Sequence, residues 1–222
     1  MNKSPEEYFQ EQDFSVDVPS RTRPGEFTAT ELAFMEKYMG VDAAPVLRSL
    51  GIDATETKKD TEPAGPALED SLDAVLRSAN QLLMVGFFLG NQEFVIPTLA
   101  VQEVIKYSTP ARLPAAPSFV AGIINQRGKI TPLIRLRDLL GIPLEGGREH
   151  KFTIICQRRG LQMGLLIDEV RTMYRVAQRD IDWRIETHLG AGIDFISGLL
   201  KVQDKLVSIV SVDKIVEVVV KQ

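Results

Sequence analysis

Few residues in this 222-residue chain are of the types that carry out chemistry, and their spacing does not assemble an active site. The two histidines, His150 and His188, fall in predicted loops or helix ends, where we expect surface side chains. With one cysteine, Cys156, the chain offers no common Cys/His metal set. The acidic pairs Asp168–Glu169 and Asp180–Asp182 are expected in solvated turns at strand ends. Without a nucleophile elbow or a Gly-rich phosphate loop, the sequence predicts no enzyme, no catalytic or metal-binding residue and no cofactor.

The segment GIINQRGKITPLIRLRDLLG predicts a β-hairpin, because two apolar runs flank the polar loop NQRG. Asn125 and Gly128 are residues that form turns, whereas Arg127 between them is not. A guanidinium group presents a rigid fork of hydrogen-bond donors, and the best candidate for a local partner is Glu103. Because a surface pair of this kind contributes only about 0–1 kcal/mol to stability, we interpret Arg127 as a recognition residue. The alternative is a solvated hairpin tip.

An internal repeat defines the organisation of the second part of the chain. Residues 119–140 align with residues 195–216 without a gap, so that Gly122 matches Gly198 and nearly every apolar position is apolar in both copies. The loop NQRG of the first copy is KVQD in the second, so the fold itself does not require Arg127. We interpret KLVSIV and VEVVV as the last strands of the chain. Sheet units of about 70 residues must close on themselves or pack together to hide their edges, which predicts two linked small barrels.

The first 80 residues differ in composition from the rest. They hold 8 Lys and Arg against 16 Asp and Glu, a net charge of −8, whereas the remaining residues carry +4 of the total of −4. Polar, Pro-containing stretches predict a largely flexible arm, in which apolar periodicity and capping residues indicate three short helices near 29–39, 43–50 and 69–79. Either the arm is a linker without a specific role, or residues 31–50 dock a second partner or fold back on the barrels.

Residues 80–220 resemble the CheW family, the coupling proteins of bacterial chemotaxis. The resemblance is carried by FVIP, LAVQEVIK, the block from LPAAPSF to LRDLLG, and GLLIDEV. It implies a mainly β fold of two SH3-like five-stranded β-barrels in a CheW-like domain, 81–220, divided at about 81–147 and 148–220, with strands that can be exchanged between them. By motif, it implies partner-binding roles for Val101, Glu103, Gly122, Asn125, Arg127, Gly128, Leu165 and Leu166, with the two leucines lining a groove between the barrels.

The resemblance also implies what the protein binds. We expect a non-enzymatic scaffold that couples the cytoplasmic tip of methyl-accepting chemoreceptors to the regulatory domain of a CheA-type histidine kinase. The alternative is an adaptor of the same fold for pilus-based motility or array positioning, whose arm recruits a further partner. There is no receiver-like domain, which argues against the CheV type of adaptor. Nucleic acid is not expected, since the basic residues around Arg127 lack an aromatic stacking platform.

The expected location is the cytoplasm, at membrane-associated receptor arrays that the protein reaches through its partners. The first residues, MNKSPEEYFQEQDF, contain no apolar signal core. The longest apolar run, Leu82–Leu89, is too short to span a bilayer, so we expect no direct membrane insertion. The lone Cys156 cannot form an internal disulfide, which favours a reducing compartment.

Overall fold

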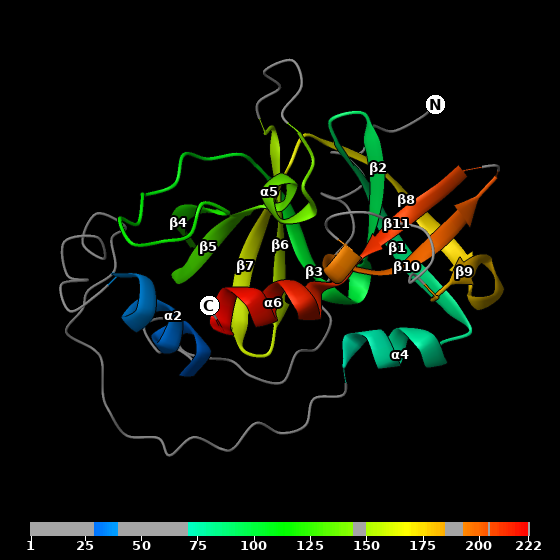
Figure 1. The fold of residues 1–222 in the computed structure, drawn as a ribbon, viewed down its shortest axis with the longest axis horizontal. Helices are drawn as coiled ribbons and strands as arrows, with labels where there is room; N and C mark the ends of the chain where they lie inside the picture. Colours follow the sequence, from blue (N-terminus) through cyan, green and yellow to red (C-terminus); the bar gives the residue numbers. More distant parts are fainter. Residues whose placement is uncertain (1–28, 40–70, 144–149, 185–192, 204, 222) are drawn as a thin grey trace.

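The computed structural model describes residues 29–39, 71–143, 150–184, 193–203 and 205–221 of the chain. Two sheets dominate it (Figure 1). The five-stranded sheet has the order β3-β6-β7-β5-β4, with β3 (Val101–Lys106), β4 (Val120–Gln126), β5 (Lys129–Arg135), β6 (Phe152–Arg158) and β7 (Leu161–Ile167). The six-stranded sheet has the order β8-β1-β2-β11-β10-β9, with β1 (Gln81–Leu89), β2 (Gln92–Pro97), β8 (Glu169–Ala177), β9 (Ile181–Asp182), β10 (Ile196–Val202) and β11 (Lys205–Val210).

This arrangement confirms the prediction of a mainly β fold with two small sheet units. The six-stranded sheet combines β1 and β2 from the start of the β region with β8 to β11 from its end, and all five strands between them form the other sheet. Both sheets therefore contain strands from 81–147 and from 148–220. Where the domain boundaries fall stays a prediction. Most neighbouring strands are antiparallel, but β2 with β11 and β5 with β7 pair in parallel.

The internal repeat is a structural repeat. The unit of β4, β5 and α5 (Leu136–Leu140) corresponds to the unit of β10, β11 and α6 (Val212–Lys221). In each copy the register of the hairpin shifts at the matched glycine, Gly122 in one and Gly198 in the other. In each copy a non-glycine residue of the turn has a positive φ, 54° at Arg127 and 53° at Gln203. The backbone conformation at this position thus belongs to the fold, whereas the arginine does not.

The segment VEVVV is helical, so the expectation of a closing strand there was wrong. In α6 the side chains of Val212, Ile215, Val216 and Val219 are buried, which is the spacing of one helical face. The hydroxyl of Ser211 accepts a hydrogen bond from the Lys214 amide (3.4 Å), as expected of a helix N-cap. The β-branched composition suggested a strand, but burial along one helical face decides the structure.

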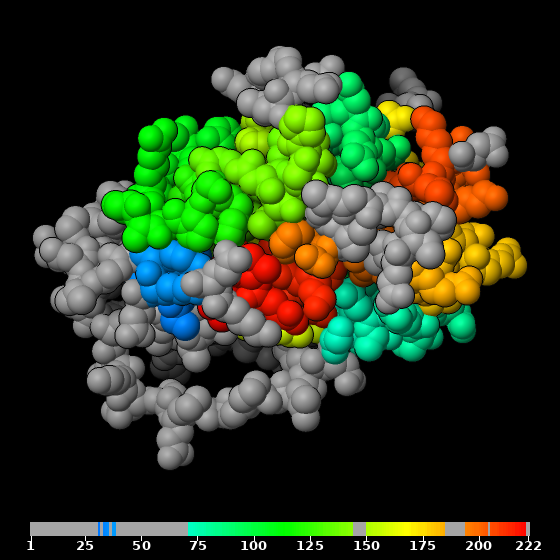
Figure 2. Space-filling view, viewed as in Figure 1, coloured from blue at the N-terminus to red at the C-terminus, as the bar shows by residue number. Residues whose placement is uncertain are grey.

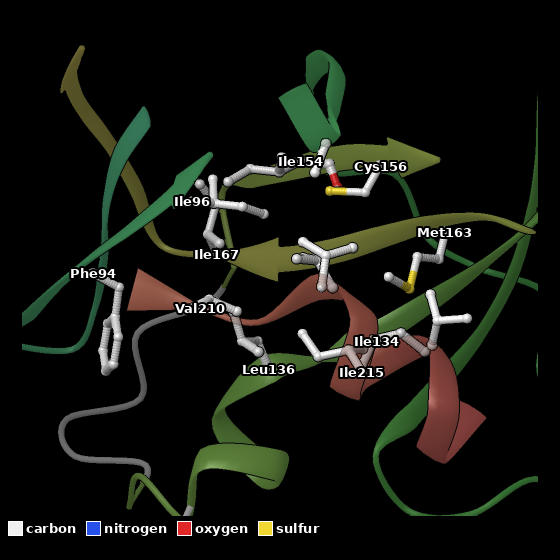
Figure 3. Close-up of a cluster of buried hydrophobic side chains, with 14 of the residues drawn as sticks. Phe94, Ile96, Ile134, Leu136, Ile154, Cys156, Met163, Ile167, Val210 and Ile215 are labelled. Atoms are coloured by element: carbon white, nitrogen blue, oxygen red, sulfur yellow. The ribbon is translucent and has the colours of Figure 1, made fainter. Parts of the chain in front are cut away.

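The main hydrophobic core lies between the sheets and beneath α6. Figure 3 shows side chains from both sheets, among them Ile96 and Ile154, packed with Ile215 of α6. Cys156 belongs to this core and is fully buried, and burial raises the pKa of its thiol. A buried thiol with a raised pKa is a poor nucleophile and metal ligand, so Cys156 contributes packing.

Two helices precede the sheets within the described residues. The predicted helix at 29–39 is confirmed as α2 (Ala29–Met39), and the one near 69–79 as the shorter α4 (Leu72–Ser78). The helix expected near 43–50 lies outside the described residues. Three 3-10 helices complete the elements of the described ranges, η2 (Thr98–Ala100), η3 (Gln178–Asp180) and η4 (Ile193–Phe195). Within the described part, no helix is both long and apolar enough to cross a membrane.

Candidate partner-binding site

The tip of the β4–β5 hairpin is a two-residue turn. Gln126 pairs with Lys129, which leaves Arg127 and Gly128 as the central residues, with φ of 54° and 81°. Two successive positive φ values are typical of a type I′ turn, in which Asn-Gly is the favoured pair. The Asn125 side chain supports the turn, since its Oδ1 accepts a hydrogen bond from the Gly128 amide (2.9 Å). Arg127 therefore occupies a position that favours other residues.

The Arg127 guanidinium projects into solvent and meets Glu103. Its side chain is 78% exposed, and its Nη2 lies 2.7 Å from Oε2 of Glu103, which is the pair that the sequence suggested. Gln126 donates from Nε2 to the other oxygen of the same carboxylate (2.8 Å). Sequence reasoning missed Gln126, although its place beside Arg127 in the loop could have indicated it.

The Glu103 contacts join the two edges of the five-stranded sheet. Glu103 lies on β3 at one edge, and Gln126 ends β4 at the other edge. No ladder hydrogen bonds connect β3 to β4 among the described strand pairs. The Glu103 carboxylate therefore bridges the boundary between β3 and the end of β4, and it fixes Arg127 above this boundary. We call this boundary, with Glu103, Gln126 and Arg127, the seam. The result is an exposed, preorganised cation beside the polar groups of an open strand edge, which suits recognition of a protein surface.

Gly122 shapes the backbone under this surface. It has a φ of 142° at the register shift of β4, and a Cβ atom there would lie 2.2 Å from the carbonyl oxygen of Ala111. Ala111 is held in place by two hydrogen bonds with Ile123, of 2.8 and 2.9 Å. Gly122 is buried, so its role in the described structure is to let the segment around Ala111 approach β4.

The structure separates the expected site residues into three groups. Glu103, Asn125, Arg127 and Gly128 come together at the seam, and Val101 lies partly buried on the same edge strand β3. Gly122 lies beneath the surface.

Leu165 and Leu166 are fully buried on the central strand β7, which corrects the expectation that they line a surface groove. The physical reason is that both faces of β7 are covered: Leu165 enters the main core, and Leu166 joins a small cluster on the opposite face with Ile124 and Leu133.

A second polar cluster, which the sequence did not reveal, lies between the sheets. Asp168 accepts hydrogen bonds from the buried Arg137 guanidinium of α5 and, at 2.6 Å, from the Gly90 amide of the β1–β2 turn. His150 Nδ1 lies 3.4 Å from the same carboxylate. Burial lowers the pKa of His150, against the opposing effect of Asp168. Asp168 was expected in a solvated turn, and this was wrong, because it is buried. His150 was expected at the surface, and it is partly exposed.

The other acidic and histidine residues considered in the sequence do not come together in the described part of the chain. Glu169, Asp180 and Asp182 are exposed, as expected, while His188 lies outside the described residues. In the described ranges, no three His, Cys, Asp or Glu side chains are close enough to hold a metal ion. The candidate site is therefore the exposed seam around Arg127.

The first prediction concerns the contribution of the β4–β5 turn to stability. We expect Arg127→Asn to leave the free energy of unfolding unchanged or to raise it by up to about 2 kcal/mol. The relief of the left-handed backbone contributes about 1–2 kcal/mol, and the loss of the Glu103 pair costs about 0–1 kcal/mol. Urea unfolding would measure this. Gln203→Asn makes the same change in the other hairpin without removing an ion pair, and a loss of more than about 1 kcal/mol in Arg127→Asn alone would show that Arg127 holds the fold.

The topology, with two small sheets joined by exchanged segments, defines a small two-sheet β domain. The CheW-like domain family matches residues 83–220, and the chain belongs to this family. It is 32% identical over 136 residues to the chemotaxis protein CheW of Helicobacter pylori, covering 61% of this chain and 82% of that protein.

Two further comparisons bear on structure and function. The crystal structure of the scaffolding protein TtCheW from Thermoanaerobacter tengcongensis superposes with a TM-score of 0.54 at 29% identity, covering 58% of this chain and 88% of that one. Protein PilI of Pseudomonas aeruginosa is 31% identical over 86 residues, which is 39% of this chain and 48% of PilI. The matched family range begins after α2 and α4, so both helices lie outside it.

Proposed function

We propose that this protein is a scaffold that couples chemoreceptors to a CheA-type histidine kinase in bacterial chemotaxis. The observation that carries the proposal is Arg127, an exposed arginine in a left-handed turn position that favours Asn or Gly. The fold imposes this backbone conformation on Gln203 of the second copy as well, so the feature that recognition would explain is the exposed arginine itself. The relatives named as chemotaxis proteins CheW and the similar structure titled as a scaffolding protein support the same role.

In this proposal the seam binds a protein partner directly. Arg127 provides a charge-assisted fork for a carboxylate or a row of carbonyls, with Glu103 and Gln126 setting its direction. Val101 extends the contact along β3, where the backbone is at the edge of the sheet. The protein acts in the cytoplasm and joins membrane-associated arrays through its partners. It transfers no group and needs no cofactor, because its work is to hold two proteins together.

The test is a pair of binding titrations. The purified full-length protein is titrated with the regulatory domain of a CheA-type kinase from the same cell and, separately, with a soluble receptor tip. We expect micromolar or tighter binding, and at least a tenfold loss with one of the two partners in Arg127→Asp, which corresponds to about 1.4 kcal/mol. Loss with the kinase domain places Arg127 on the kinase side, and loss with the receptor tip places it on the receptor side.

A matched control separates a specific contact from general charge. Arg179→Asp makes the same charge change at an 87% exposed side chain on η3, away from the seam, and should bind both partners as the unmodified protein does. Equal binding by Arg127→Asp and the unmodified protein in both titrations would remove Arg127 from the site.

A second candidate function rests on the match to PilI. In this alternative the same fold serves as an adaptor for pilus-based motility or array positioning, and the arm recruits the additional partner. If the unmodified protein binds neither the kinase domain nor the receptor tip of the chemotaxis system, titration with the corresponding proteins of the pilus system becomes the deciding experiment.

A further inference from the structure

The helix α2 packs against the CheW-like domain although it lies outside the family range. Its contacts are with α6 and β7. Among the α2 side chains that the structure describes, the apolar Phe34, Met35 and Tyr38 and the acidic Glu31 are buried, and the rings of Phe34 and Tyr38 are 4.9 Å apart. Figure 2 shows α2 in blue beside α6 in red on one face of the molecule. The helix thus presents one apolar face to the domain.

The α2 helix also completes the end of α6. The last carbonyl groups of any α-helix have no partner within the helix. Here the Tyr38 hydroxyl donates to the carbonyl oxygen of Val219 (3.2 Å), and the Lys37 ammonium donates to that of Val220 (3.1 Å). A cation at this position also interacts favourably with the helix dipole. The contact therefore combines an apolar face with two donors aimed at the C-terminus of α6.

The other end of α6 is held by α4. The carboxylate of Asp213 accepts a hydrogen bond from the Leu72 amide (2.6 Å), and the Ser211 hydroxyl donates to Asp73 (2.9 Å). Burial would raise the pKa of Asp213, but Arg158 and the Leu72 amide outweigh burial and lower it. This end is a charged network, whereas the α2 end depends on three apolar side chains and two donors.

We propose that α6 and the adjacent part of β7 form a helix-binding face, that α2 is its tethered and displaceable occupant, and that the face accepts in its place an external amphipathic helix of the same chemistry. Such a helix presents aromatic and Met side chains at the spacing of Phe34, Met35 and Tyr38, with donors for the end of α6 at the positions of Lys37 and Tyr38. This goes beyond the proposed function, since neither the kinase nor the receptor enters the argument.

Two features make α2 displaceable. First, α2 belongs to neither sheet, and Lys37 and Tyr38 bond to the domain through their side chains, so α2 can leave without breaking a strand ladder. Second, the burial of the apolar side chains Phe34, Met35 and Tyr38 has to offset the ordering of an eleven-residue helix, so little net free energy remains to hold it. Because α2 is part of the same chain, the contact is intramolecular, with an effective concentration on the order of a millimolar.

The experiment uses full-length protein and a fluorescently labelled peptide with the sequence of α2, residues 29–39. Phe34→Glu should release the tethered helix and expose the face, whereas Ala33→Glu puts the same charge on the neighbouring, exposed position. We expect the peptide to bind Phe34→Glu at least tenfold more tightly than Ala33→Glu. Binding should weaken when the peptide carries Tyr38→Phe, because one donor to α6 is lost. Equal binding to both proteins, or to neither, would overturn the proposal.

Two checks keep the result interpretable. The chain has one tryptophan, Trp183, outside α2, and its emission spectrum reports whether each variant is folded. If Phe34→Glu does not fold, Tyr38→Phe in the full-length protein replaces it, with a smaller gain in peptide binding expected. Concentration-dependent dimers of the unmodified protein that Phe34→Glu abolishes would identify the external helix as α2 of a second copy and would support the face. The same dimers in both proteins would count against α2 as the exchanged element.

Discussion

Replacement of Asp168 by alanine should lower the free energy of unfolding by about 3–5 kcal/mol. Its carboxylate is buried and accepts hydrogen bonds from Arg137 and from the Gly90 amide. Removal of one partner of a buried ion pair leaves the other as an uncompensated charge, and losses of about this size are typical. Because the three groups come from α5, the β1–β2 turn and the residue between β7 and β8, the damage should spread to both sheets.

Urea unfolding followed by circular dichroism would measure the loss. Asp138→Ala is the matched control, since Asp138 is exposed beside Arg137 on α5, and its replacement should change stability by no more than about 0.5 kcal/mol. Arg137→Met combined with Asp168→Ala should cost less than the sum of the two single changes, because the double variant leaves no buried charge unpaired. Strict additivity would show that the two side chains do not act as a pair.

The second large effect concerns Gly122. We expect Gly122→Ala to lower stability by about 3 kcal/mol or more, because a positive φ adds backbone strain of about 1–3 kcal/mol and the added methyl group meets a fixed carbonyl. The Cβ atom would lie 2.2 Å from the Ala111 oxygen, so β4 or the segment around Ala111 must move. Thermal unfolding of the purified variant would measure the change.

Gly128→Ala distinguishes strain from collision. Gly128 has a φ of 81°, but a Cβ atom there would meet nothing within 4 Å. We expect a loss of only about 1–2 kcal/mol, as for a left-handed residue without a clash. If both variants lose the same amount, the contact with Ala111 is not responsible. A binding defect in any Gly122 variant, including Gly122→Asp, must accordingly be corrected for the fraction of folded protein before it is assigned to a partner contact.

The features that the sequence predicted are those with a local or repeated signal. Alternating apolar residues and turn formers identified the hairpins, and alignment of two copies showed that the position of Arg127 is a turn in both. The same alignment could have corrected the assignment of 212–221, because VDKIV in the second copy matches LRDLL, a helix in the first. The valine-rich composition favoured a strand at this position, although the alignment indicated a helix.

The features that the sequence did not predict depend on contacts between distant segments. Nothing near Asp168 indicates that Arg137 and Gly90 lie beside it, since the three are brought together only when the sheets pack. Leu165 and Leu166 are buried because β7 is the central strand of its sheet, and strand order follows from the whole topology. The docking of α2 on α6 joins the two ends of the described chain, and no local pattern could indicate that partner.

The order of strands in the six-stranded sheet has a consequence for how the chain acquires its structure. The hairpin of β1 and β2 is made early during synthesis, but a two-stranded hairpin alone is marginally stable in water. Its neighbours are β8 and β11, and Phe94 of β2 pairs with Ser208 of β11 near the end of the chain. Until β11 has left the ribosome, β2 has an open edge, and contacts of such sequence separation form slowly. Folding of this sheet therefore waits for the synthesis of β11, and a chaperone that covers β2 would act on the nascent chain.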